Sequence, residues 1–404
     1  MIVGQDRAIS AGIFAGLTNP WLILQDMKRS LIYFDNAAST PIPGEVVEIM
    51  QACLAEVYGN PSALHEAGRR ARIAVEQSRR SVARCLGLKP SEVFFTSGGT
   101  ESNNAALWGC CKDMGKKHFI TSPLEHPSVL NTLESLARHM DARVHFVDLG
   151  PDGHIDLDHL DGLAGQYPGQ VVSLMHANNE IGNLLPVKDV ADICRNHDML
   201  FHSDTVQTIG KFQMDFQVLG MDFASGSAHK FHGPKGAGFL VVREGRHFKP
   251  FVSGGGQERN MRAGTENVCG IVGLARALEW MQDSMQENVF WIKNLRSLLL
   301  QSLQSEVPGL GFNGDVSGSC LYTIVNLSLP PGLDAEMVLP RLDMEGICVS
   351  SGSACSSGSM KGSHVLTAMG ADPHRPSLRI SLGKNNTTDD VKHLVRVLKD
   401  MVTA

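Results

Sequence analysis

Hydrophobic residues gather in seven short runs along the first two thirds of this chain, separated by stretches of helical or loop length. The runs cover residues 93–96, 118–122, 144–149, 171–176, 200–203, 222–224 and 237–242. Apolar and polar positions barely alternate within them, which is typical of strands buried on both faces of a sheet. Seven such strands with helices between them predict an α/β layered domain with a mostly parallel sheet.

Helical periodicity appears on both sides of these runs. Between residues 66 and 86, apolar residues recur at spacings of four or seven, and arginines fill the other faces. A long helical stretch over 270–305 is expected to link the first domain to a smaller α/β domain at the C-terminus. Strands are expected there over 323–329 and 378–381, and helices over 334–344, 364–369 and 389–402.

The pattern gives provisional domain boundaries. Residues 39–285 are expected to form the large domain, and 27–38 with 286–404 the small one. Residues 1–26 show little periodicity and are expected to be a disordered extension or to precede the true start, for which Met27 is the candidate. Arg7 is the only basic residue before Lys28, too few for a mitochondrial presequence, and Asn19-Pro20 breaks the apolar span that a secretion signal would need.

Composition narrows the class of protein. A chain of 404 residues with 43% hydrophobic and 19% charged content can bury a large core, and a net charge of −6 argues against nucleic-acid binding. No apolar run reaches the roughly 18 residues of a membrane helix. The nine cysteines form an odd set without a C-x-x-C pair, so we expect reduced thiols in a cytoplasmic protein that acts on small molecules.

The segment 225–230, Ser-Gly-Ser-Ala-His-Lys, places Lys230 at the end of an apolar strand among small residues. Asp204 ends another apolar run 26 residues earlier, about one strand–helix–strand unit away. A lysine that can form a Schiff base and a carboxylate that keeps a pyridine nitrogen protonated are what pyridoxal phosphate requires. Lys230 is the only lysine that we expect beside the Asp204 strand. An unrelated surface lysine and aspartate remain the alternative.

A candidate phosphate site follows the strand at 93–96, where Ser-Gly-Gly-Thr leads into a helical stretch. Backbone N–H groups and the helix dipole at such a turn attract a phosphate. Gly98 and Gly99 allow close approach of the backbone, and Thr100 adds a hydroxyl. The alternative is a simple helix cap by Ser97 or Thr100.

Three polar residues could surround the cofactor ring. His126 follows the strand at 118–122 and could stack on the ring and move protons, although a structural histidine is the commoner case. Asn179 ends another strand, and Gln207 lies three residues after Asp204. Both amides could bond the ring, or belong to polar turns.

Cys355 lies within a run of Ser and Gly over residues 350–359 that has almost no packing material. That composition predicts a mobile loop, on which a thiolate could travel and react. No Lys, Arg or His is closer in sequence than Lys361, so nothing local predicts a lowered thiol pKa.

From Ile32 onward the chain resembles the pyridoxal phosphate-dependent cysteine desulfurases of the IscS/NifS type, members of the class V aminotransferases with the aspartate aminotransferase fold (fold type I). Several motifs in order carry the resemblance, at residues 33–40, 59–62, 96–104, 125–126, 176–182, 202–207, 227–230, 262–267 and 350–357. The cysteine loop is similar to that of the long-loop branch of the family.

The resemblance implies a role for each candidate. Lys230 forms the Schiff base, Asp204 pairs with the pyridinium, and His126 is the ring-stacking acid–base residue. Contacts to the ring are assigned to Asn179 and Gln207, contacts to the phosphate to Gly99, Thr100, Ser227 and His229, and contacts to the substrate to Arg379, Asn179 and Asn36. Thr265 matches a position that reaches the phosphate of the other subunit, which implies a homodimer.

The implied reaction converts L-cysteine to L-alanine and leaves the sulfur on Cys355 as a persulfide. A sulfur-acceptor protein, such as an iron–sulfur scaffold or a component of tRNA thiolation, would then receive it. No resident metal is implied, although Cys355 could be a transient iron–sulfur ligand. A selenocysteine lyase, an aminotransferase and a sulfur-trafficking scaffold with secondary catalysis are the alternatives.

Overall fold

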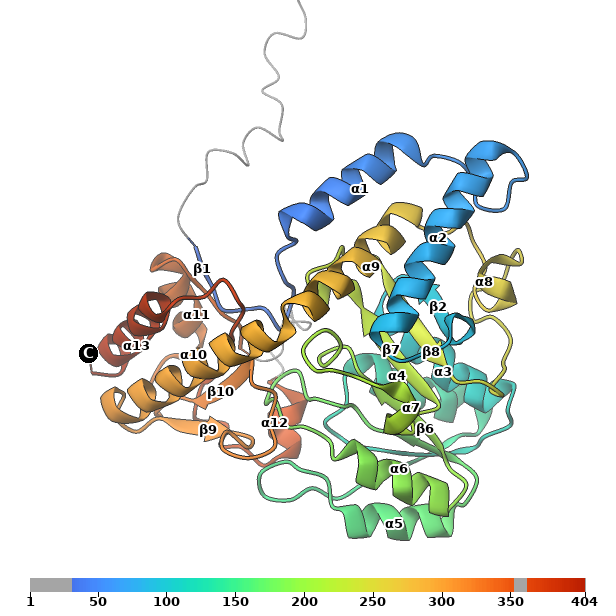
Figure 1. Cartoon of the computed structure of the whole chain (residues 1–404). Coiled ribbons are helices and arrows are strands. Elements are labelled where there is room, and N and C mark those ends of the chain that lie inside the picture. The colour runs from blue at the N-terminus through green and yellow to red at the C-terminus, as the bar shows by residue number, and fades with distance from the viewer. Residues whose placement is uncertain (1–30, 352–361, 404) are drawn as a thin grey trace, which may run out of the picture.

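The computed structural model describes residues 31–351 and 362–403, so the predictions for residues 1–26 and Cys355 lie outside the described residues. Figure 1 shows two bodies, a larger one built around one sheet and a smaller one that carries the C-terminus. No helix in these ranges combines the length and hydrophobicity that crossing a lipid bilayer requires.

The large sheet contains the seven strands that the hydrophobic runs predicted. Their order in the sheet is β2-β8-β7-β6-β5-β3-β4. The strands are β2 (Val93–Thr96), β3 (His118–Thr121), β4 (Arg143–Phe146), β5 (Val171–Ser173), β6 (Leu200–Asp204), β7 (Phe223–Ser227) and β8 (Gly238–Val242). β8 is antiparallel to both of its neighbours, and the other pairs are parallel. The prediction of a mostly parallel sheet is therefore confirmed.

The prediction that all seven strands are buried was wrong for β4. It pairs only with β3 at the edge of the sheet, and its end residues Arg143 and Phe146 are exposed. Because an edge strand has one neighbour, part of its surface stays open to solvent.

Helices cover both faces of the sheet and create two hydrophobic cores. Consecutive residues of a strand point to opposite faces, so Phe201 and Phe239 pack in one core while Leu200 and Leu240 pack in the other. The first core includes α2 (Glu66–Cys85), α6 (Val187–Asn196) and α9 (Val268–Asp283), and the second includes α3 (Gly99–Lys112) and α4 (Pro127–Met140). The remaining helices of the large body are α1 (Gly44–Glu56), α5 (Leu157–Gln166), α7 (Phe216–Leu219) and α8 (Gln257–Asn260).

The small body has its own core around an antiparallel sheet of order β12-β10-β9. Its strands are β9 (Gly311–Asn313), β10 (Ile324–Ser328) and β12 (Ser377–Ser381), and a second pair joins β1 (Ile32–Tyr33) to β11 (Ile347–Cys348) in parallel. Its helices are α10 (Met285–Glu306), α11 (Ala335–Met344), α12 (His364–Ala368) and α13 (Thr388–Thr403). β9 and β11 were not expected as strands, being only three and two residues long.

The expected helix over 270–305 is divided in two at Ser284, between α9 on the large sheet and α10 in the small body (Figure 1). This break lies next to the predicted boundary at residues 285 and 286, although the domain boundaries themselves stay a prediction.

The direction of the strands in the large sheet positions the candidate site. β2, β6 and β7 run in the same direction, so their carboxyl ends meet at one edge.

A buried ion pair joins α2 to the sheet. Arg79, only 2% exposed, donates to both carboxylate oxygens of Glu258, at 2.7 and 2.8 Å, and to the carbonyl of Val93. Glu258 also accepts from the backbone N–H of Phe95 at 2.8 Å. Nε of Arg79 also donates to Glu76 at 3.1 Å, but Glu76 is half-exposed, so Glu258 is the buried partner of the Arg79 charge.

We predict that Glu258→Ala lowers the free energy of unfolding by about 3 kcal/mol, because it removes the buried partner of the Arg79 charge and leaves only the half-exposed Glu76. Urea denaturation followed by circular dichroism measures this. The control is Glu66→Ala, which removes the exposed pair with Arg70 and should cost no more than about 0.5 kcal/mol. Equal losses in the two variants would contradict the assigned role of Glu258.

Candidate active site

A hollow of about 400 Å³ lies at the carboxyl ends of β2 and β7, where α3 begins. It is lined by Ala38, Ser39, Ser97, Gly98, Gly99, Thr100, Glu101, Ser227, His229, Lys235 and Gly236. The structure thus brings together all four residues expected at the phosphate.

The backbone at the start of α3 is open to an anion. Gly98 occupies the N-cap position without a side-chain cap, so the expected alternative of a cap by Ser97 or Thr100 is not observed. A Cβ on Gly99 would lie 2.5 Å from Cγ2 of Val206, which explains why glycine is required there. Uncapped N–H groups at a helix N-terminus favour a phosphate.

Lys230 follows β7 in the short 3₁₀ helix η3 (Ala228–Lys230). Its Nζ donates to the carbonyl of Ala37 at 2.7 Å and to that of Ala38 at 2.9 Å. The carbonyl of Ala37 also accepts from Nε2 of Gln207 at 3.0 Å. One backbone oxygen therefore links the expected Schiff-base lysine to an expected ring contact.

Asp204 ends β6, is 7% exposed, and starts a hydrogen-bond chain toward His126. Its carboxylate accepts from Nδ2 of Asn103 at 2.7 Å and from the backbone N–H of Val206 at 3.0 Å. Nδ2 of Asn103 also donates to Oγ of Ser128 at 2.9 Å. Because that hydroxyl already accepts one bond, it can donate to Nδ1 of His126, 2.8 Å away.

These contacts define the protonation of His126. The backbone N–H of Ser128 donates to its Nδ1 at 3.1 Å, so the neutral ring carries its proton on Nε2. Burial lowers the pKa of His126, and the charges of Lys230 and His364 lower it further, while Asp204 acts in the opposite direction. At neutral pH, therefore, His126 presents a neutral imidazole.

His229 also stays neutral at pH 7. Burial lowers its pKa to about 4, and the nearby Lys230 and Lys235 contribute in the same direction. Its Nδ1 lies 3.4 Å from Oγ of Ser39, and its ring lines the hollow at α3. A neutral ring can donate a hydrogen bond to a phosphate without adding charge.

The expected substrate residues meet at β12 of the small body, which carries Arg379 and contacts both Asn36 and Asn179. Arg379 on β12 is 2% exposed and donates to Asp35 at 2.8 Å and to the carbonyl of Asn179 at 2.9 Å. Its Nε is buried and has no hydrogen-bond partner among the described residues. Asn36 is buried and donates to the carbonyl of Ser381. The guanidinium is thus held at both Nη atoms, while its buried Nε–H has no partner among the described residues.

Thr265 does not join this group within one chain. It is exposed and lines a separate hollow of about 320 Å³ together with Tyr58, Asn60 and Glu266.

Sequence reasoning gave no role to Asn103, Ser128 or Lys211, although Asn103 lies inside a quoted motif. The expectation that Lys230 is the only lysine near the Asp204 strand was wrong. Lys211 is 6% exposed and donates to Oε1 of Gln207 at 3.0 Å. Its position seven residues after Asp204 carried no signal, because a lysine in a loop is usually exposed.

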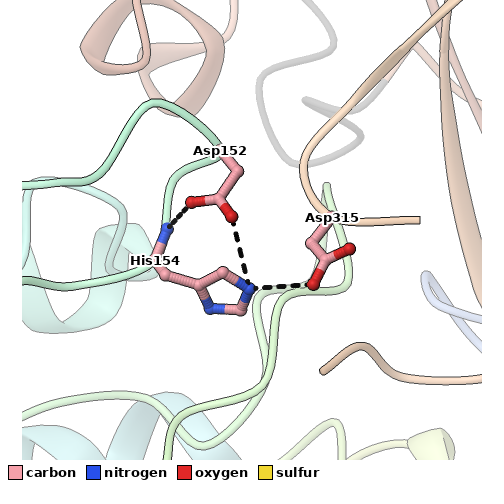
Figure 2. Close-up of side chains that lie close together, drawn as sticks. All are labelled: Asp152, His154 and Asp315. Atoms are coloured by element: carbon pink, nitrogen blue, oxygen red, sulfur yellow. Dashed lines mark hydrogen bonds and ion pairs between the residues drawn. The ribbon is translucent and has the colours of Figure 1, made fainter. Parts of the chain in front are cut away.

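Away from the hollow, Asp152 and His154 of the large body meet Asp315 of the small body (Figure 2). Nε2 of His154 lies 3.2 Å from Asp315. The backbone N–H of Gly318 lowers the pKa of Asp315 to about 2, helped by His154. These groups satisfy one another, so we describe them as a hydrogen-bonded contact between the two bodies.

Comparison with known proteins gives consistent matches over most of the chain. Residues 32–394 match the family described as Aminotransferase class-V. The chain is 39% identical to "Cysteine desulfurase IscS" of Dictyoglomus turgidum over 93% of this chain and 95% of that protein, and 40% identical to "Cysteine desulfurase" of Sinorhizobium fredii over 92% and 96%. A solved structure titled "NIFS-like protein" matches with a TM-score of 0.85 and 37% identity, over 92% of this chain and 99% of that one.

We predict that Ser128→Ala raises the pKa of His126, because it removes a donor that stabilises the unprotonated Nδ1. Protonation on acidification would then occur at a higher pH than in the wild type. NMR titration of the His126 ring in the cofactor-free protein measures this. Thr132→Ala on the same helix is the control and should leave the titration unchanged. A lower pKa in Ser128→Ala would contradict the hydrogen-bond chain.

Proposed function

We propose that this chain, which belongs to the class V aminotransferase family, is a pyridoxal phosphate-dependent cysteine desulfurase that converts L-cysteine to L-alanine. The meeting of Lys230, Asp204 and the N-terminus of α3 at one edge of the sheet is the observation that carries the cofactor assignment. Similarity to cysteine desulfurases over nearly the whole chain supports the choice of substrate.

The described residues fit pyridoxal phosphate. The uncapped start of α3 suits its phosphate, and Lys230 suits its aldehyde. A buried Asp204 suits a ring nitrogen that must remain protonated, since its negative charge opposes loss of that proton. When bound, the cofactor supplies an electron-withdrawing ring that accepts negative charge from the substrate.

The surrounding residues hold and move protons. Lys230 would hold the cofactor through its amine, and that amine, when free, would carry a proton. His126 would lie beside the ring and, being neutral with its proton on Nε2, could exchange a proton there. The chain through Ser128 and Asn103 keeps this ring oriented relative to Asp204.

Arg379 binds the substrate carboxylate. A rigid guanidinium recognises a carboxylate through paired N–H donors, and its unused Nε supplies one donor at this site. Asp35 and the carbonyl of Asn179 hold the group in position. Asn36 fixes the neighbouring backbone through Ser381, so its contribution to substrate binding is through position.

Cys355 takes the sulfur. Its thiolate attacks the sulfur of the substrate, an S–S bond forms, and the C–S bond breaks with its electrons passing to the carbon skeleton. Protonation of that skeleton gives alanine. The sum is L-cysteine plus a thiol giving L-alanine plus a persulfide, so no external oxidant or reductant is needed.

The protein acts as a homodimer. Thr265 is exposed beside Tyr58, which is 83% exposed, and Leu54 and Leu64 nearby are 67% and 84% exposed. Large apolar side chains exposed together are typical of an interface. A second copy covering this surface would bring Thr265 to the phosphate of its partner, as the family resemblance implies.

The persulfide is delivered to a sulfur-acceptor protein in the cytoplasm, an iron–sulfur scaffold or a tRNA-thiolation component. The eight cysteines of the described residues are all unpaired, which supports a reducing compartment. Comparing alanine release from cysteine and from selenocysteine separates this function from a selenocysteine lyase.

We predict that Lys230→Ala abolishes the covalent link to pyridoxal phosphate, because Lys230 supplies the amine. Borohydride reduction followed by mass spectrometry should label the Lys230 peptide in the wild type and nothing in the variant. Lys117→Ala, on the surface, is the control and should be labelled normally. A label on Lys211 in the wild type would show that the wrong lysine was assigned.

We predict that Cys355→Ser keeps the cofactor band and its change on adding cysteine, but loses persulfide formation and most alanine production. The hydroxyl is a poor nucleophile toward sulfur at neutral pH. Mass spectrometry after brief cysteine treatment should place one added sulfur on the Cys355 peptide. Cys348→Ser is the control and should retain activity. Finding the sulfur on Cys348 or Cys320 would identify a different acceptor thiol.

A further inference from the structure

Lys211 is the most deeply buried lysine near the site, and the roles given above do not use it. Its Nζ donates to the backbone carbonyl of Gln207 at 2.9 Å and to Oε1 of the same residue at 3.0 Å. No ion pair involves Lys211 in the described part of the chain. Its amine is thus committed to one neighbour, Gln207.

The charges near Lys211 disfavour its protonation. Burial lowers its pKa to about 7, and the positive charges of Lys230 and Arg379 act in the same direction. A neutral amine still has two N–H donors, the number needed for the two bonds to Gln207. The contact therefore persists in either protonation state.

This contact determines which end of the Gln207 amide faces the active site. Amide oxygen and nitrogen have nearly the same shape, so only hydrogen-bond partners distinguish the two orientations. With Oε1 on Lys211, Nε2 donates to the carbonyl of Ala37, which also accepts from Lys230. The reversed amide would place its oxygen against the carbonyl of Ala37, and its N–H groups against Lys211, which has no acceptor while protonated.

We propose that Lys211 is a positioning residue that orients the Gln207 amide so that its N–H donor faces Lys230 and the bound cofactor. The inference rests on the proposed function, because it requires pyridoxal phosphate beside Gln207. Without Lys211, the amide would have no donor on Oε1, and only the carbonyl of Ala37 would favour this orientation.

If the Lys211 side chain only stabilised the fold, the effect of replacing it would not depend on Gln207. The backbone carbonyl of Lys211 accepts from the hydroxyl of Tyr322 at 3.0 Å, which ties this segment to the small body. That bond involves only the main chain and survives replacement of the side chain. Effects of a side-chain substitution therefore report on Gln207.

The experiment is a double-mutant cycle with Lys211→Met, Gln207→Leu and the combined variant in the full chain. Affinity of the cofactor-free protein for pyridoxal phosphate and the position of the absorbance band of the bound cofactor are measured, with urea denaturation for stability. Lys116→Met is the matched control, since Lys116 is half-buried and donates to the carbonyl of Gly169, away from the site.

Lys211→Met should weaken cofactor binding by about 3- to 10-fold, the effect of one hydrogen bond, and shift the band. In the Gln207→Leu background the same substitution should cost less than about twofold, since there is no amide left to orient. Equal losses in both backgrounds, or no loss in either, would overturn the proposal. Lys116→Met should match the wild type in both measurements.

A further variant covers the case in which Lys211→Met does not fold. Gln207→Glu keeps an oxygen for Lys211, replaces the N–H donor by a second oxygen facing Ala37 and adds a negative charge, so it should weaken binding and shift the band. Wild-type behaviour of this variant would show that the donor has no role, and the proposal would be wrong. A wild type that does not bind pyridoxal phosphate would refute the proposed function as well, whereas normal binding with unaffected variants would refute this inference alone.

Discussion

The buried carboxylate of Asp204 is the group around which the site is organised. A carboxylate that is 7% exposed is costly unless donors or opposite charges compensate it, and here Asn103 and the backbone of Val206 supply the donors. The same Asn103 continues through Ser128 to His126. A single electrostatic requirement thus fixes an amide, a hydroxyl and an imidazole, on α3 and at the start of α4.

The segment from Asp35 to Ala38 contacts functional residues of both the small and the large body. Asp35 pairs with Arg379 on the small body, and two residues later the carbonyl of Ala37 accepts from Lys230 on the large one. The proposed substrate arginine and the proposed cofactor lysine are therefore held by one short piece of chain. A movement of the small body against the large sheet would therefore displace this segment and change the contacts of both Arg379 and Lys230.

Much of this protein could be predicted from local pattern. Unalternating hydrophobic runs gave seven strands, and the polar residues that follow them gave Lys230, Asp204 and the glycine turn, because strand ends in a parallel sheet share one edge. The pattern gave wrong burial for β4, where exposure depends on being at the edge, and missed β9 and β11, which are too short to show a period.

The amino-acid sequence by itself determined the strands, the residue types of the site and the family to which they belong. Tertiary structure alone decided the pairings: Asn103 with Asp204, Arg79 with Glu258, and Lys230 with the carbonyl of Ala37. Short-range pattern specifies how a segment buries its own apolar residues. Hydrogen-bond partners of buried polar groups come from segments far apart in sequence, so they are settled only when the sheet and the two bodies have packed together.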